Sequence, residues 1–148
     1  GSYMMANSEL ATSLLLGKKM IVVILDDRGY GCIERLQLKT GSPSFNNMLD
    51  DCVPEGGESS RIDFAMHARA MGADSVHVKD VAELKAAMVK ARAAKRTQVI
   101  VIDTDPMPGT GAGGTWWDVA VPEVSTRAEV NEARKGYEEA TKRQWPVN

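Results

Sequence analysis

Short apolar runs alternate along the chain with longer segments of helical period. The runs at 20–25 and 98–103 are β-branched and continuous, and a shorter one lies at 74–78. The first run predicts a strand that is covered on both faces. Because helices and strands alternate, we expect an α/β fold with a parallel sheet flanked by helices. The segments with shared apolar faces of helical period are 3–16, 61–72 and 80–95.

Residues with a strong capping preference mark the ends of these helices. Gly17 is well placed as the C-cap of the first helix, and Ser60 or Asp63 opens the second. Asp80 opens the third. A short helix is expected at 31–38, and the Gly, Pro, Ser, Asn and Asp residues that follow predict a long surface loop.

The character of the chain changes after residue 105. A Gly- and Pro-rich arm leads into a polar helix at 126–143, so we divide the chain into an α/β domain, 1–105, and a C-terminal arm and helix, 106–148. Trp116 and Trp117 in this arm need burial, either against the domain or against a neighbouring subunit. The second choice predicts a homo-oligomer, a dimer or tetramer in a full-length protein.

Asp26 and Asp27 stand side by side where the first strand ends. Two adjacent carboxylates repel each other and resist leaving water, which favours a cationic partner over an apolar one. Ligands of parallel sheets bind at the carboxyl ends of the strands, and Mg²⁺ with a phosphate group is the natural pair for such a site. A solvated acidic turn is the alternative. An acidic pair with Asp103 at a later strand end also resembles a receiver-like signalling module, although no following strand ends in lysine.

Length, charge and composition argue against some classes of function. The 148 residues are the length of one domain, and the net charge of −2 comes without a basic stripe, which argues against nucleic-acid binding. No apolar run is long enough to span a membrane, so we expect a soluble protein. The small and scattered charge favours a small-molecule substrate or a protein partner, and two cysteines outside any C-x-x-C arrangement favour a cytoplasmic location. Cys32 and Cys52 predict free thiols in a reducing compartment.

Other reactive side chains have ordinary structural interpretations. His67 and His77 have no partners at metal-ligand spacing, and we expect both to be structural. Cys32 follows the glycine-rich turn and could approach a cofactor, but a buried inert thiol is the expected outcome.

Two motifs carry a family resemblance. "GSYMMANSELATSL" followed by "VVILDDRGYG" resembles the signature of thiamine-diphosphate enzymes, in which Gly-Asp-Gly begins a helix and Asn-Asn ends the next strand. Gly1 matches the last glycine of the first element, so the aspartate of that element falls before the chain starts. The resemblance implies that Asp27, in place of the second Asn, and the backbone carbonyl of Gly29 bind Mg²⁺. The positions that it places beside the diphosphate of the cofactor are Gly1, Ser2, Tyr30 and Gly31.

The resemblance covers about the first 105 residues and implies a thiamine-diphosphate-binding fold. In this family an activating glutamate comes from a separate pyrimidine-binding domain, and no residue here matches it. We therefore expect the chain to be an N-terminally truncated piece of a larger enzyme and to be inactive alone.

Further segments narrow the subfamily. "GYGCIERLQ", "SFNN", "IDFAMHARAMGA" and "GGTWWDVAVPEVS" are similar to the hydrolases of myo-inositol catabolism that open the ring of trihydroxycyclohexane-1,2-dione to 5-deoxy-glucuronate. An acetolactate-synthase-like enzyme acting on 2-oxo acids is the alternative within the family.

Overall fold

A three-stranded parallel sheet forms the centre of the fold in the computed structural model, which describes residues 1–58, 61–108 and 120–144. The strand order is β1-β3-β2, and β3 pairs in parallel with both neighbours. The strands are β1 (Ile21–Asp26), β2 (Asp74–Val78) and β3 (Gln98–Asp103). The helices are α1 (Ser2–Ala6), α2 (Glu9–Leu15), α3 (Gly31–Lys39), the 3-10 turn η1 (Leu49–Asp51), α4 (Phe64–Ala70), α5 (Val81–Ala93) and α6 (Ala128–Thr141). The predicted α/β class is confirmed.

Alternating residues of β3 build two apolar layers, one on each face of the sheet. Val99 and Val101 pack with residues of α2 and α4. Ile100 and Ile102 point to the other face and pack with Ala91 of α5. Full burial of a Val or Ile side chain contributes about 1.5–3 kcal/mol, so β3 is the main apolar anchor of the sheet. The prediction of helices on both faces is therefore confirmed.

The prediction that β1 is covered on both of its faces is wrong. Val23 is 37% exposed and Leu25 is 63% exposed, although Ile24 between them is buried. The reason is that, among the described residues, Ile21 is the one residue of β1 that packs against the α5 layer. Among the described residues β1 is also an outer strand, with a neighbour on one edge only.

The single helix expected at 3–16 is two helices, α1 and α2. Asn7 ends α1, and its side-chain amide donates to the carbonyl of Met4 at 3.2 Å. Ser8 begins the next helix. Asn and Ser compete for backbone hydrogen bonds and favour helix ends, which explains the break.

The predicted caps are in place. Asp63 accepts a hydrogen bond from the backbone N–H of Met66 at 2.7 Å, and Asp80 accepts one from Glu83 at 2.8 Å. Gly17 directly follows Leu16, the C-cap residue of α2, and has φ +63°, the left-handed conformation that glycine adopts most readily. Residue 60, the other candidate cap, lies outside the described residues.

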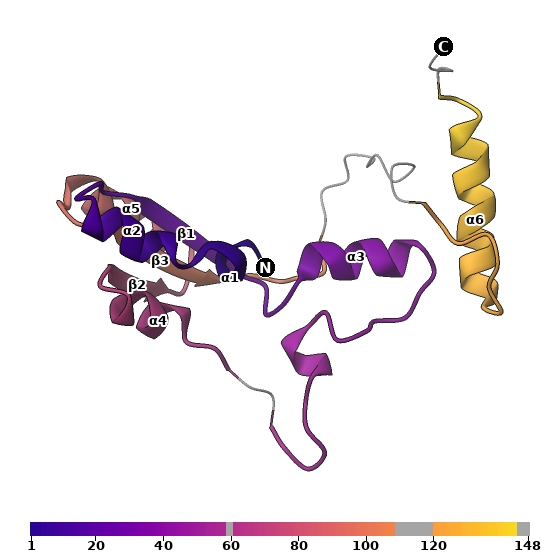
Figure 1. Ribbon diagram of the computed structural model, residues 1–148, viewed down its shortest axis with the longest axis horizontal. Coiled ribbons are helices and arrows are strands. Elements are labelled where there is room, and N and C mark those ends of the chain that lie inside the picture. The colour runs from indigo at the N-terminus through magenta and orange to yellow at the C-terminus, as the bar shows by residue number, and fades with distance from the viewer. Residues whose placement is uncertain (59–60, 109–119, 145–148) are drawn as a thin grey trace.

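The C-terminal helix α6 follows the predicted polar segment, and α3 lies between it and the sheet (Figure 1). Gly41, at φ +82°, allows the turn after α3 to approach the backbone of Glu129 and Val130 so closely that a Cβ would collide with it. Arg134 donates to the carbonyl of Val121 at 2.8 Å. Trp116 and Trp117 lie outside the described residues. Among the described residues, no helix has both the length and the apolar character to cross a membrane.

Candidate functional site

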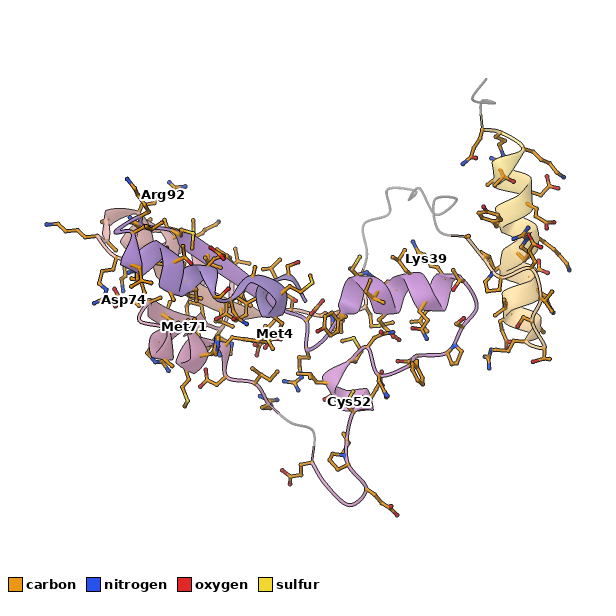
Figure 2. All side chains as sticks on the ribbon, viewed as in Figure 1. Met4, Lys39, Cys52, Met71, Asp74 and Arg92 are labelled. Atoms are coloured by element: carbon orange, nitrogen blue, oxygen red, sulfur yellow. The ribbon has the colours of Figure 1, made fainter. Side chains whose placement is uncertain are left out.

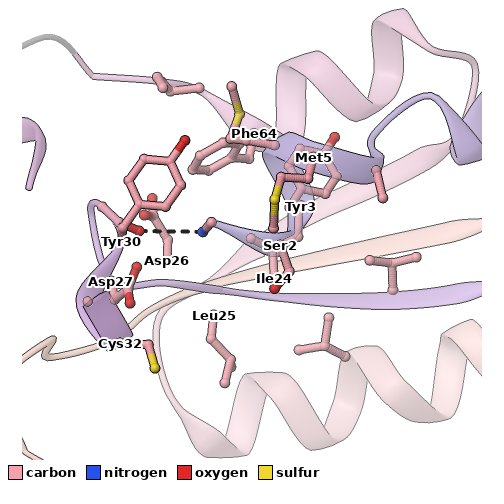
Figure 3. Close-up of a pocket in the computed structure, with 18 of the residues that line it drawn as sticks. Ser2, Tyr3, Met5, Ile24, Leu25, Asp26, Asp27, Tyr30, Cys32 and Phe64 are labelled. Atoms are coloured by element: carbon pink, nitrogen blue, oxygen red, sulfur yellow. Dashed lines mark hydrogen bonds between the residues drawn. The ribbon is translucent and has the colours of Figure 1, made fainter. Parts of the chain in front are cut away.

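A pocket of about 850 Å³ lies at the carboxyl end of β1. Its walls come from α1, from β1 and from the turn that leads into α3, and Figure 3 shows the side chains of Asp26, Asp27 and Tyr30 gathered at one end. The site residues expected from the sequence all line this pocket: Gly1, Ser2, Asp27, Gly29, Tyr30 and Gly31. The fold thus brings together two segments that lie almost thirty residues apart.

The two adjacent aspartates have different surroundings. Asp26 Oδ1 accepts a hydrogen bond from the backbone N–H of Arg28 at 2.9 Å, and this bond closes a tight turn. Arg28 itself has φ +58°, which is uncommon for a residue other than glycine. Asp26 is therefore engaged in the turn.

The carboxylate of Asp27 lies against the first residue of α3. A Cβ at Gly31 would collide with Asp27 Oδ2, so glycine leaves the space that this carboxylate occupies. Helix α3 has no side-chain cap, and the partial positive charge at a helix N-terminus stabilises a nearby anion. The local geometry thus places the Asp27 carboxylate among the residues that line the pocket, where its oxygen atoms are available as ligands.

The turn at Gly29 and Tyr30 is held by the loop before η1. Gly29 forms an isolated antiparallel bridge with Met48, and the Tyr30 N–H donates to the carbonyl of Asn47 at 2.8 Å. A Cβ at Gly29 would overlap the Asn47 carbonyl, so this close approach requires glycine. The carbonyl of Gly29 accepts from the terminal amine of Gly1 at 3.4 Å (Figure 3).

An aromatic cluster attaches α1 to α4 and forms the apolar wall of the pocket. The Tyr3 hydroxyl shares a hydrogen bond with His67 Nδ1 at 2.7 Å, and the Tyr3 ring meets Phe64 edge-on with centroids 5.4 Å apart. Burial raises the pKa of the Tyr3 hydroxyl, because the phenolate is poorly solvated there. His67 thus has the structural role expected for it. Sequence reasoning missed Tyr3 and Phe64, because no local pattern links residues on helices so far apart.

The other reactive side chains divide between the pocket and the surface. Cys32 is exposed and lines the pocket, so the expectation that it is buried is wrong. The reason is that α3, which carries Cys32, projects away from the sheet (Figure 1). Cys52 is a free and exposed thiol on the loop after η1 (Figure 2). His77 pairs with Asp103 at 2.8 Å on the surface, and neither residue lines the pocket.

The pocket fits a magnesium diphosphate. It offers one carboxylate from Asp27 and one backbone carbonyl from Gly29, and Mg²⁺ commonly takes its other ligands from phosphate oxygens and water. Within the described residues no three His, Cys, Asp or Glu side chains form a cluster that could hold a metal ion alone. Glycine at position 31 leaves room for the Asp27 carboxylate itself, and glycine at position 29 lets the Asn47 carbonyl approach the turn. The donor set therefore suits a metal that arrives with a phosphate-bearing ligand.

Comparison with known proteins identifies related chains. Curated relatives are 3D-(3,5/4)-trihydroxycyclohexane-1,2-dione hydrolases. The one from Geobacillus thermodenitrificans is 34% identical over 146 residues, which covers 96% of this chain and 23% of the relative. The one from Clostridium botulinum is 36% identical over 139 residues, with coverage of 91% and 22%. The chain thus spans about a fifth of the length of the curated relatives it matches.

A solved structure and a family description agree with the fold. The thiamine diphosphate-dependent 4-hydroxybenzoylformate decarboxylase of Rhodococcus jostii superposes with a TM-score of 0.53 at 19% identity, over 65% of this chain and 16% of that chain. The family described as "Thiamine pyrophosphate enzyme, C-terminal TPP binding domain" matches residues 1–103. Because this match covers most of the chain, the protein belongs to the family of C-terminal TPP-binding domains of thiamine pyrophosphate enzymes.

Proposed function

We propose that the chain is the diphosphate- and Mg²⁺-binding part of a thiamine-diphosphate-dependent hydrolase of myo-inositol catabolism. Its substrate is trihydroxycyclohexane-1,2-dione, and cleavage of the ring C–C bond yields 5-deoxy-glucuronate. The substrate assignment is supported by the names of the curated relatives. The single structural observation that carries the binding role is the convergence of Gly1, Asp27 and Gly29 on one pocket.

Each residue of the site has a defined task. Asp27 Oδ and the Gly29 carbonyl would hold Mg²⁺, and Gly1, Ser2, Tyr30 and Gly31 would flank the diphosphate. Bound thiamine diphosphate supplies the carbanion-stabilising chemistry of C–C bond cleavage. Without Mg²⁺ the negative charges of Asp26 and Asp27 would repel the diphosphate, and a bound Mg²⁺ ion would reverse the sign of that interaction.

The working unit is larger than this binding part. We assign residues 1–105 to the binding domain and 106–148 to an arm and helix that contact another subunit of a dimeric or tetrameric cytoplasmic enzyme. The activating glutamate belongs to a different domain. Sedimentation of the full-length enzyme as a monomer would contradict the role of the arm.

The binding role is tested by calorimetric titration of the full-length enzyme with thiamine diphosphate over a range of Mg²⁺ concentrations. Asp27→Ala should raise the half-saturating Mg²⁺ concentration by about tenfold or more, since it loses a charged metal ligand. Asp26→Ala should act through the turn that its hydrogen bond to Arg28 closes, and should lower stability more than metal dependence. Equal Mg²⁺ dependence in wild type and Asp27→Ala would overturn the ligand assignment.

The substrate is tested separately with the purified wild-type enzyme. Release of 5-deoxy-glucuronate from the cyclic dione supports the proposal. Turnover of 2-oxo acids with no reaction of the dione would favour the acetolactate-synthase-like alternative.

A further inference from the structure

Glu34 is a buried carboxylate outside the pocket. It lies on α3 and is only 4% exposed, which is costly for a charged group unless hydrogen bonds compensate. Its Oε2 accepts from Asn47 Nδ2 at 3.0 Å. The Ser44 hydroxyl lies 3.1 Å from the same oxygen and also contacts Asp51. The buried charge thus attaches the loop before η1 to α3.

Asn47 connects this buried charge to the turn of the candidate site. Its side-chain Nδ2 donates to Glu34 and, at 2.6 Å, to Gln37 Oε1. Its backbone carbonyl accepts from the N–H of Tyr30 at 2.8 Å. The carbonyl of Tyr30 in turn accepts from the backbone N–H of Glu34 at 3.0 Å. Glu34, Asn47 and Tyr30 therefore form a closed ring of hydrogen bonds.

The hydrogen bond from the Tyr30 N–H to the Asn47 carbonyl, which belongs to this ring, orients the Gly29 carbonyl. Gly29 C=O and Tyr30 N–H belong to one planar trans peptide group, in which the two bonds point in opposite directions. Because the N–H is held on the Asn47 carbonyl, the Gly29 oxygen must face the other way. There it lies 3.4 Å from the Gly1 nitrogen and lines the pocket.

We infer that Glu34 is a positioning residue that acts through Asn47 to aim the Gly29 carbonyl at the metal. The inference rests on the proposed function, because it needs a metal at Gly29. Residues that orient metal ligands typically change metal affinity by about 10–100-fold when they are replaced. If the Gly29 carbonyl is no longer held in this orientation, the Mg²⁺ requirement should rise, while the affinity for the cofactor at saturating Mg²⁺ should stay close to that of the wild type.

The test uses the full-length enzyme and measures thiamine diphosphate binding by calorimetry at a series of Mg²⁺ concentrations. Asn47→Asp keeps the size of the side chain but places a second carboxylate against Glu34. It should raise the half-saturating Mg²⁺ concentration by about tenfold. Asn47→Ala removes the contact with Glu34 without adding a charge. It should also raise the half-saturating Mg²⁺ concentration, and it replaces Asn47→Asp in the test if that variant does not fold. Ser42→Ala, in the same loop with no side-chain hydrogen bond in the described structure, is the matched control.

Rescue separates positioning from a general loss of packing. In the double variant Asn47→Asp with Glu34→Gln, donor and acceptor of the contact between positions 34 and 47 exchange places, because an amide at position 34 can donate to a carboxylate at 47. The side-chain amide of Gln37, whose oxygen accepts from Asn47, can turn to donate its Nε2 to the same carboxylate. The Mg²⁺ requirement should return to within about threefold of wild type. A double variant as impaired as Asn47→Asp alone would overturn the inference, as would Asn47 variants that match Ser42→Ala. If Asp27→Ala also leaves the Mg²⁺ requirement unchanged, the proposed metal site itself fails.

Discussion

Gly31→Ala should weaken the binding of Mg²⁺ at the proposed site while it changes the free energy of unfolding only slightly. A Cβ at Gly31 would collide with Asp27 Oδ2, and it would lie 3.2 Å from Asp27 Cγ and 3.3 Å from a guanidinium nitrogen of Arg35. The carboxylate must therefore turn away, into a position where it can no longer hold the Mg²⁺ ion of the proposed site.

The two energetic effects of this change have opposite signs. A shift of about 30° from a staggered rotamer costs about 0.5–1.5 kcal/mol. Replacing glycine by alanine in a helix contributes up to about 1 kcal/mol in the other direction, and less at the first helical residue, which Gly31 is. The free energy of unfolding should therefore change by less than about 1 kcal/mol, while the Mg²⁺ requirement rises about tenfold through loss of the ligand geometry.

Gly136→Ala is the matched control for this prediction. Gly136 lies in α6, and a Cβ there meets no atom within 4 Å among the described residues. This variant should raise the free energy of unfolding by up to about 1 kcal/mol and leave the metal requirement unchanged. The assays are urea denaturation and Mg²⁺-dependent binding of thiamine diphosphate. A Gly31→Ala enzyme with the wild-type Mg²⁺ requirement would refute the reasoning.

Three further predictions concern stability. Asp80→Ala should lower the free energy of unfolding by about 1 kcal/mol, because α5 loses its N-cap; urea denaturation measures it. Gly41→Ala should lower it by more than 1 kcal/mol, since φ +82° and the backbone of α6 both oppose a side chain, and a stability equal to wild type would contradict this. Because the pKa of the Tyr3 hydroxyl is raised in the folded protein, the unfolded chain loses the hydroxyl proton at a lower pH than the folded one. The free energy of unfolding should therefore fall as the pH rises above about 10. Urea denaturation at pH 8–11 should show a smaller fall in Tyr3→Phe.

Local patterns in the sequence predicted the elements well. The bounds of β2 and β3 agree with the apolar runs, and Asp63 and Asp80 cap the helices as expected, because strand length and capping depend on neighbouring residues. The gathering of Gly1 and Gly29 in one pocket follows from the family resemblance and could not be obtained from periodicity alone.

Contacts between distant segments were beyond such reasoning. The hydrogen bond between Tyr3 and His67 and the burial of Glu34 depend on how helices and loops pack, and no motif around these residues signals them. The exposure of Leu25 has the same origin, since the composition of a strand does not tell how far a neighbouring helix extends over it.

The outer position of β1 has a consequence for handling the isolated chain. Among the described residues β1 has a neighbour on one edge only, and such a strand presents a row of backbone donors and acceptors that another chain can use as a template. Natural edge strands are commonly protected by lysine, proline or a bulge, whereas β1 carries Val22, Val23 and Leu25 in a regular register with β3. In concentrated solution this edge favours intermolecular strand addition, and with it aggregation.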